Sequence, residues 1–171
     1  MTVDITNANN EVTEVYTQLK PLIEGVVEKN ARSIETLVKK IKDNIDTLTK
    51  QELESYMLQL SIETYYFSKI KDMGILKQEC ALILMKEKQA EVFNKTTGTQ
   101  VIRANQATID TLDKQTVNIM YNAIANSLKS KLDEAHRLVN VLSSVLISRN
   151  AEAKLKGVRD DDENLHSNDV W

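Results

Sequence analysis

Apolar residues recur at steps of three and four over a long stretch near the end of the chain, from about Asp113 to Ala153. This spacing places them on one face of a single α-helix. Such a helix would measure roughly 60 Å, whereas a compact domain of this size is about 30–40 Å across. The pattern predicts a long helix that protrudes or packs against another chain. Its face carries Val117, Tyr121, Ile124, Leu128, Ala135, Val139, Leu142 and Leu146.

Few residues in the sequence interrupt helices. The 171 residues include one proline and four glycines, too few for the many turns of a β or α/β fold. The fold class is therefore predicted to be all-α, an elongated helical bundle with a long C-terminal helix of coiled-coil type. Near-heptad spacing with small and β-branched residues also predicts assembly into a homo-oligomer.

Three sections are expected along the chain. Residues 1–48 form an N-terminal helical section, residues 49–155 a helical core with the long closing helix, and residues 156–171 an acidic, disordered tail. Within the first section, residues 1–9 are polar and are expected to fray.

The first helix is expected to begin at Asn10. Pro21 predicts a kink or the start of a new helix. Asn30 falls on the apolar face, where a polar side chain can set the register of a helix pair. The apolar positions of this section are Val12, Val15, Leu19, Leu22, Val26, Ile34, Leu37, Ile41, Ile45 and Leu48.

The stretch from Thr49 to Arg103 carries the clearest local signals. Thr49 and Glu52 form a capping box, which predicts a helix start. Gly74 is expected to end this helix or to bend it, and the sequence leaves both arrangements open. A polar turn surrounds Gly98. The faces expected to be buried carry Leu53, Tyr56, Met57, Leu60, Thr64, Phe67 and Ile70 before Gly74, and Leu76, Cys80, Ile83, Leu84 and Phe93 after it.

No pattern typical of an enzyme or a metal site occurs in the sequence. His136 and His166 are the only histidines, and neither belongs to a zinc or di-iron motif. Neither common nucleotide-binding glycine motif is present. Cys80 lies on an expected apolar face, so it is interpreted as a core residue rather than a nucleophile. We therefore predict a protein without catalytic activity, cofactor or metal.

A cytosolic location is expected from three observations. Cys80 is the only cysteine, which is typical of a reducing compartment. The first residues lack the basic and apolar regions of a signal peptide. The longest apolar run, from Ala81 to Met85, is too short to span a bilayer, so no membrane partner is expected.

The net charge of −3 is unevenly distributed. Residues 69–103 carry seven basic and four acidic side chains, which gives this section a net charge of +3. Basic side chains beside a polar turn can follow a phosphate backbone, and Tyr65, Tyr66 and Phe93 offer planes for base stacking. The plainer interpretation is a solvated helix face with aromatic residues in the core. The candidate nucleic-acid-binding residues are Lys86, Lys88, Lys95 and Arg103.

Residues 50–153 contain a helix order and scattered residues that resemble the UvsY-type recombination mediators of tailed phages. The resemblance lies in the run from Tyr66 to Glu79, its Lys-rich continuation and the turn at Gly98. It continues in the closing helix, through Tyr121, Lys131-Leu132-Asp133 and Arg149-Asn150-Ala151-Glu152.

The resemblance implies a helical protein that forms a homo-oligomeric ring and binds single-stranded DNA. It also implies partners: a RecA-type recombinase, loaded onto strands covered by single-stranded-DNA-binding protein. Lys86, Lys88, Lys95 and Arg103 would contact the DNA, and the protein would act in the cytoplasm of a phage-infected host cell. The chain departs from the family pattern at Val92-Phe93-Asn94, which is less basic than expected before the turn.

Two hypotheses of function therefore follow from the sequence. The first is a non-catalytic recombination mediator that binds single-stranded DNA. The alternative is a helical scaffold or adaptor protein, active in virion assembly or host interaction, which acts through protein–protein contacts without nucleic acid.

Overall fold

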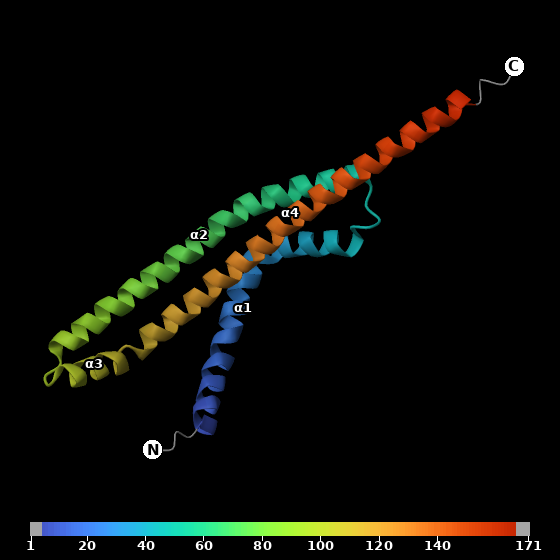
Figure 1. Ribbon diagram of the computed structural model, residues 1–171. Coiled ribbons are helices and arrows are strands. Elements are labelled where there is room, and N and C mark those ends of the chain that lie inside the picture. The colour runs from blue at the N-terminus through green and yellow to red at the C-terminus, as the bar shows by residue number, and fades with distance from the viewer. Residues whose placement is uncertain (1–4, 167–171) are drawn as a thin grey trace. The chain divides into compact units, whose positions relative to one another are not determined.

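The protein is described over residues 5–166 by a computed structural model that contains four α-helices and no strand in this range (Figure 1). Helix α1 spans Ile5–Asn44, α2 spans Lys50–Lys95, α3 spans Gln100–Ile109 and α4 spans Leu112–His166. Side chains are described for residues 13–155. The predicted all-α fold with a long last helix is confirmed.

The long helices are shared between two compact units. Unit 1 consists of Met1–Arg32 and Tyr66–Leu132, and unit 2 consists of Ser33–Tyr65 and Asp133–Trp171. Helices α1, α2 and α4 each contribute one part to each unit, because their lengths carry them from one unit into the other. The expected sections 1–48, 49–155 and 156–171 stay a prediction.

Helix α1 begins earlier than predicted and continues through its proline. It starts at Ile5 rather than Asn10, and Pro21 lies inside it without starting a new helix. Proline removes one backbone hydrogen bond, here the one to the Thr17 carbonyl. The side chains around Thr17 are exposed, so water can reach the carbonyl that the proline leaves unbonded.

The buried face of α1 differs by one residue from the predicted face in the first part of the helix. Val26 is exposed, and Val27 is buried instead. The reason is register, because Val27 continues the three-and-four spacing of Ile34 and Ile41 and Val26 does not. Asn30 is half-buried and donates to the Val26 carbonyl at 2.6 Å, so a bond within α1 satisfies its amide. The buried residues are Val27, Ala31, Ile34, Val38 and Ile41.

The predicted capping box at the start of α2 is confirmed. The backbone N–H of Thr49 donates to Glu52 Oε2 at 2.8 Å, and the Glu52 N–H donates to Thr49 Oγ1 at 3.3 Å. The bond from the Thr49 backbone lowers the pKa of Glu52. The predicted core face of this part of α2 is confirmed at Leu53, Leu60, Thr64 and Phe67, which are buried. The other predicted residues, Tyr56, Met57 and Ile70, are half-buried.

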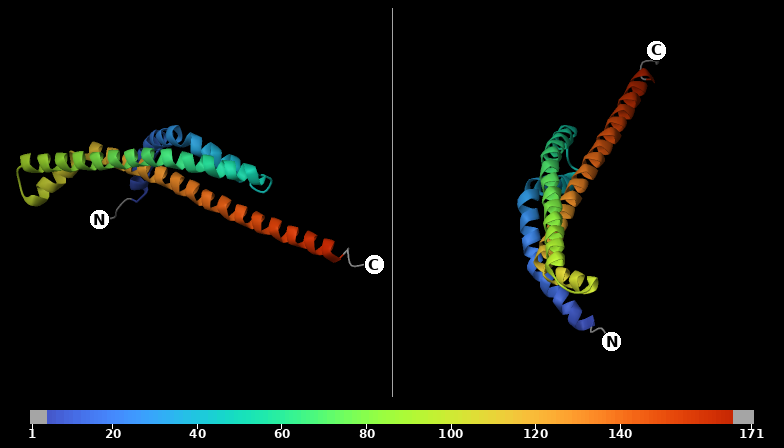
Figure 2. Two further views of the ribbon diagram at one scale, coloured as in Figure 1. Left: turned by 90° about the horizontal axis from the view of Figure 1, so that it is seen from above. Right: turned by 90° about the vertical axis from the view of Figure 1, so that its left-hand side faces the viewer.

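Gly74 does not end α2, which continues to Lys95, so the single long helix is the one found of the two arrangements that the sequence left open. A Cβ atom at Gly74 would lie 3.1 Å from Leu128 Cδ1 and 3.9 Å from the Ala125 Cα of α4. The missing side chain therefore serves close helix packing rather than a left-handed turn. Within unit 1, α2 and α4 run side by side in both views of Figure 2.

The predicted apolar face of α4 is confirmed over most of its length. Ile124, Leu128, Ala135, Leu142 and Leu146 are all buried. Val117 is exposed, and Leu138 is buried where Val139 was expected to be, with Val139 half-buried.

The end of α4 lies beyond the predicted boundary. Residues 156–166, expected to belong to a disordered tail, are helical, and residues 167–171 with Trp171 lie outside the described residues. Adding a residue to an existing helix costs little compared with starting a new one. That difference accounts for a helix that continues into a section without apolar periodicity.

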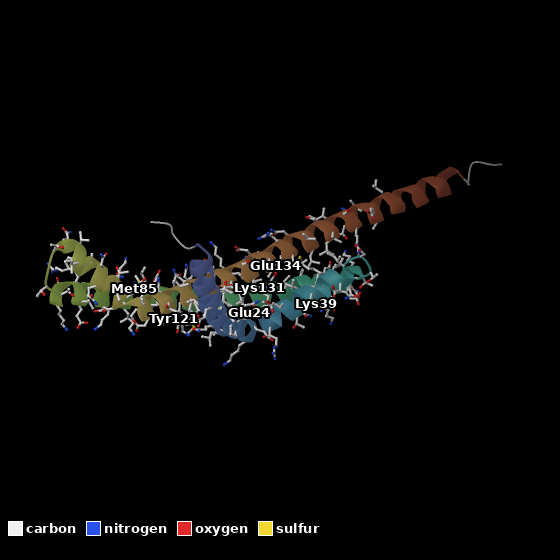
Figure 3. All side chains as sticks on the ribbon, turned by 90° about the horizontal axis from the view of Figure 1, so that it is seen from below. Glu24, Lys39, Met85, Tyr121, Lys131 and Glu134 are labelled. Atoms are coloured by element: carbon white, nitrogen blue, oxygen red, sulfur yellow. The ribbon has the colours of Figure 1, made fainter. Side chains whose placement is uncertain are left out.

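Other helices of the same chain pack against the apolar face of α4. In unit 1, Leu128 lies against Gly74 of α2. In unit 2, Ala135, Leu142 and Leu146 of this face are buried within the chain itself. An ion pair also links α1 to α4 there, from Lys42 to Glu134 at 2.6 Å, and Glu134 is labelled in Figure 3. The heptad spacing of α4 is thus explained by packing within one chain, and it no longer requires a second one.

In unit 2, Arg149 of α4 is bonded to the backbone just after the end of α1. Its guanidinium donates to the carbonyls of Leu48, Ile45 and Asp46, the last two at 3.2 and 3.3 Å. Carbonyls beyond the end of a helix have no partner within that helix, and a cation is favourable beside them. Arg149 therefore satisfies three acceptors with one side chain.

Replacing Gly74 by leucine should lower the free energy of unfolding by about 1–3 kcal/mol, because the added side chain has no room beside Leu128. The control is Gly25→Leu in α1, where no atom lies within 4 Å of an added Cβ. It should stabilise the protein by up to about 1 kcal/mol, because leucine favours helices over glycine. Urea unfolding followed by circular dichroism measures both. Equal effects of the two substitutions would contradict the close packing of α2 and α4.

Replacing Arg149 by methionine should lower the free energy of unfolding by about 1.5–3 kcal/mol, because three carbonyls lose a charged donor. Arg149→Lys should recover only part of this loss, since an ammonium lacks the planar fork of donors. Arg137→Met, at an exposed position of the same helix, is the control and should change stability by less than about 0.5 kcal/mol. A loss no larger than the control's, in the same unfolding assay, would show that Arg149 does not stabilise unit 2.

Candidate interaction surfaces of unit 1

The turn between α2 and α3 positions the predicted basic residues. Gly98 has a φ of +124°, the only positive φ among the described residues, and a glycine accepts this conformation at low cost. Thr99 then caps α3, with the Ile102 N–H donating to Thr99 Oγ1 at 3.5 Å. Residues 100–106 are therefore part of a capped helix.

Two of the four candidate DNA-binding residues are paired with a carboxylate of their own helix. Lys88 donates to Glu91 Oε2 at 2.8 Å, and Lys95 donates to Glu91 Oε1. The hydrogen bond from Lys88, followed by that from Lys95, lowers the pKa of Glu91 to about 2. The same contact raises the pKa of Lys88. A phosphate group would have to compete with Glu91 for both lysines.

Arg103 holds α3 against the end of α2. Its Nε donates to the Phe93 carbonyl at 2.9 Å, and its guanidinium carbon lies 4.1 Å from the centre of the Phe93 ring. Both side chains are half-buried. One face of the Phe93 ring is therefore covered by Arg103, and the arginine contributes to packing between the two helices.

Lys86 is the remaining candidate. Its side chain is exposed and enters none of the ion pairs found between residues 13 and 155. Tyr65 and Tyr66 are also exposed, although Tyr65 belongs to unit 2 and Tyr66 to unit 1. Of the four predicted residues, the structure brings Lys88 and Lys95 together around Glu91, and Arg103 and Lys86 have separate environments.

The outward face of α2 is the feature that sequence reasoning missed. Leu76, Cys80, Ile83 and Leu84 were predicted to be buried, and all four are exposed. We define the outer stripe as Met73, Leu76, Cys80 and Ile83. The exposed fractions of Met73, Leu76 and Ile83 are 61%, 58% and 55%.

The small residues of α2 explain this correction. Gly74 and Ala81 are buried and lie seven residues apart, so they share one face of the helix. Leu76 and Ile83 follow them by two residues, which is a rotation of about 200° around the helix. The large apolar side chains therefore lie opposite the buried face. The three-residue spacing from Met73 to Leu76 and from Cys80 to Ile83 was the signal of a second apolar face.

Hollows lie between the helices of unit 1, and one of about 320 Å³ lies between α2 and α3. A groove of about 420 Å³ between α2 and α4 contains Glu87, Lys88, Glu91 and Lys114 beside apolar residues. A cavity of about 210 Å³ where α1, α2 and α4 meet is mostly apolar. Met85 of α2 and Tyr121 of α4, which lines that cavity, are labelled in Figure 3. Across the described chain, no cluster of three His, Cys, Asp or Glu side chains has the arrangement of a metal site.

None of the helices in the described range combines the length and the hydropathy needed to cross a bilayer. Comparisons with protein families, with characterised proteins and with solved structures found no match. The resemblance to UvsY-type mediators stays a prediction.

The Glu91 carboxyl should titrate near pH 2 in an NMR titration, because Lys88 and Lys95 donate to it. The double variant Lys88→Met/Lys95→Met should return the midpoint toward the ordinary pKa of 4.5. Since the folded pKa is the lower one, these ion pairs stabilise the folded chain above pH 4.5, and the contribution is lost as the pH falls toward 2. Lys86→Met should leave the midpoint unchanged. A midpoint near 4.5 in the unmodified protein would show that the pairs do not form in solution.

Proposed function

We propose that this protein is a non-catalytic helical scaffold or adaptor that acts through protein–protein contacts. The outer stripe of α2 supports this proposal, because three large apolar side chains there are more than half exposed on one helix face. Monomeric proteins seldom expose contiguous apolar surface unless it serves an interaction. Burial of this stripe by a partner would supply the hydrophobic driving force of the contact.

The position of the stripe points to a helical partner. Its four residues alternate steps of three and four along α2, which is the spacing that a second helix covers in a coiled coil. Helix α4 packs on the opposite side, against Gly74, and Ala81 is buried on that side as well. Of the four stripe residues, Met73 also lines the cavity where α1, α2 and α4 meet. A partner helix can therefore reach the stripe without displacing the core.

A second candidate function is the single-stranded DNA binding of a recombination mediator, which would load a RecA-type recombinase. The net charge of +3 over residues 69–103 and the exposed Lys86 favour it. Lys88 and Lys95 are exposed, and surface ion pairs such as theirs with Glu91 are weak enough for phosphate to replace. This candidate ranks second because Arg103 is engaged with Phe93 and Glu91 competes for two of the lysines.

Two double variants separate these functions. Leu76→Asp/Ile83→Asp places charges on the stripe, and Lys88→Glu/Lys95→Glu reverses two exposed charges on the basic side of the same helix. The tagged full chain, cross-linked in the cells that produce it, should yield protein cross-links near α2. The yield of these cross-links should fall about tenfold or more in the stripe variant, because interfaces exclude unpaired charge. The basic variant should give the same yield as the unmodified chain.

Fluorescence anisotropy with a labelled single-stranded oligonucleotide at low salt is the companion measurement. The scaffold proposal expects no binding by the unmodified chain. The second candidate would be supported instead if the unmodified chain bound the oligonucleotide in a salt-sensitive way and the basic variant did not bind it. In that case the stripe variant should also retain its cross-links.

A further inference from the structure

The outer stripe has charged residues at both ends. Continuing its alternation of three and four residues leads back to Lys69 and forward to Glu87, and both side chains are exposed. Along α2 the seam therefore reads Lys69, Met73, Leu76, Cys80, Ile83 and Glu87. It is basic at one end, apolar in the middle and acidic at the other end, and all of it lies within unit 1.

Two copies of this seam that run in opposite directions match each other. The apolar residues of one copy meet those of the other, and each basic end meets an acidic end. In an antiparallel pair of α2 helices, Met73 lies opposite Ile83 of the second copy, and Leu76 lies opposite Cys80 of the second copy. The same register places each Lys69 opposite the other copy's Glu87. One register thus buries the whole apolar stripe and pairs opposite charges at both of its ends.

The flanking residues fit the same register. Asp72 and Lys86 of opposite copies become neighbours near both ends of the seam, and both residues are exposed. Asp72 is also paired with Lys71 of its own helix at 2.9 Å. Like charges meet only near the centre, where Lys77 faces Lys77 and Glu79 faces Glu79. These positions are also exposed, so salt and water screen the repulsion.

A parallel pair is less favourable. It would place Lys69 against Lys69 and Glu87 against Glu87 within the seam itself, where the charges are closest. Its attractive flanking contacts would be Asp72 with Lys77 and Lys86 with Glu91. Glu91 is already bonded to Lys88 and Lys95, so the second contact would have to replace existing ion pairs.

We infer that the outer stripe is covered by a second copy of this chain, with the two α2 helices antiparallel. Charge self-complementarity identifies the occupant, since a two-fold axis brings the same patch of both copies together. This inference rests on the proposed function, because it takes the stripe to be a protein contact surface.

A charge-swap series on the full chain tests the pairing. Sedimentation equilibrium should show a dimer for the unmodified protein. Lys69→Glu and Glu87→Lys should each weaken dimerisation about tenfold, and the double variant should restore it, because the opposite charges meet again. In a parallel pair, like charges face each other in all four proteins, so unchanged dimerisation across the series would overturn the antiparallel arrangement.

Disulfide trapping gives an independent readout in a Cys80→Ser background, which removes the only native cysteine. A mixture of Lys69→Cys chains and Glu87→Cys chains should form the mixed disulfide. Neither variant alone should cross-link, because identical positions would lie roughly 27 Å apart along antiparallel helices, whereas a disulfide needs Cα atoms within about 7 Å. Cross-linking of each variant with itself, but not with the other, would overturn the inference.

A monomeric unmodified chain at all concentrations would also overturn the inference. The cross-linking arm then separates the two proposals. Protein cross-links that depend on the stripe in a monomeric chain would leave the proposed function standing with a different partner. Their absence would remove the proposed function as well.

Discussion

The close approach of α2 and α4 at Gly74 is the contact on which the arrangement of unit 1 depends. Leu128 occupies the space that any larger side chain at this position would need. Gly74 and the buried Ala81 recur after two helical turns, so α2 faces its own core with small residues. The same choice of residues moves the large apolar side chains to the opposite face. Close packing inside unit 1 and an exposed stripe outside it therefore have one cause.

The charges near the α2–α3 turn show that net charge and accessible charge are different quantities. The section around the turn is basic by composition, but Glu91 binds two of its lysines and Phe93 holds its arginine. These contacts are local and follow from helix spacing, since residues three or four apart meet on a helix surface. Of the four candidate residues, Lys86 is the exposed one outside the ion pairs found between residues 13 and 155.

The long heptad pattern of α4 does not by itself indicate assembly with a second chain. The apolar face of α4 does form a helix–helix contact, and Leu128, Ala135 and Leu142 are buried along it. Its partners are helices of the same chain, so the spacing indicates a helix–helix contact without indicating which chain supplies the other helix. On α2, by contrast, Leu76, Ile83 and Leu84 are exposed where the sequence predicted burial.

The sequence by itself determined the all-α class, the cap at Thr49 and the buried face of α4, because these depend on composition and on contacts within a few residues. Local spacing also predicted the core residues Leu53, Leu60 and Phe67. It could not decide the role of Gly74, since a glycine serves a turn and a close packing contact equally well. Only the tertiary structure decided which of the two apolar faces of α2 is buried and which charges remain open. Both outcomes depend on what lies opposite each residue in space, and the spacing along one helix does not contain that information.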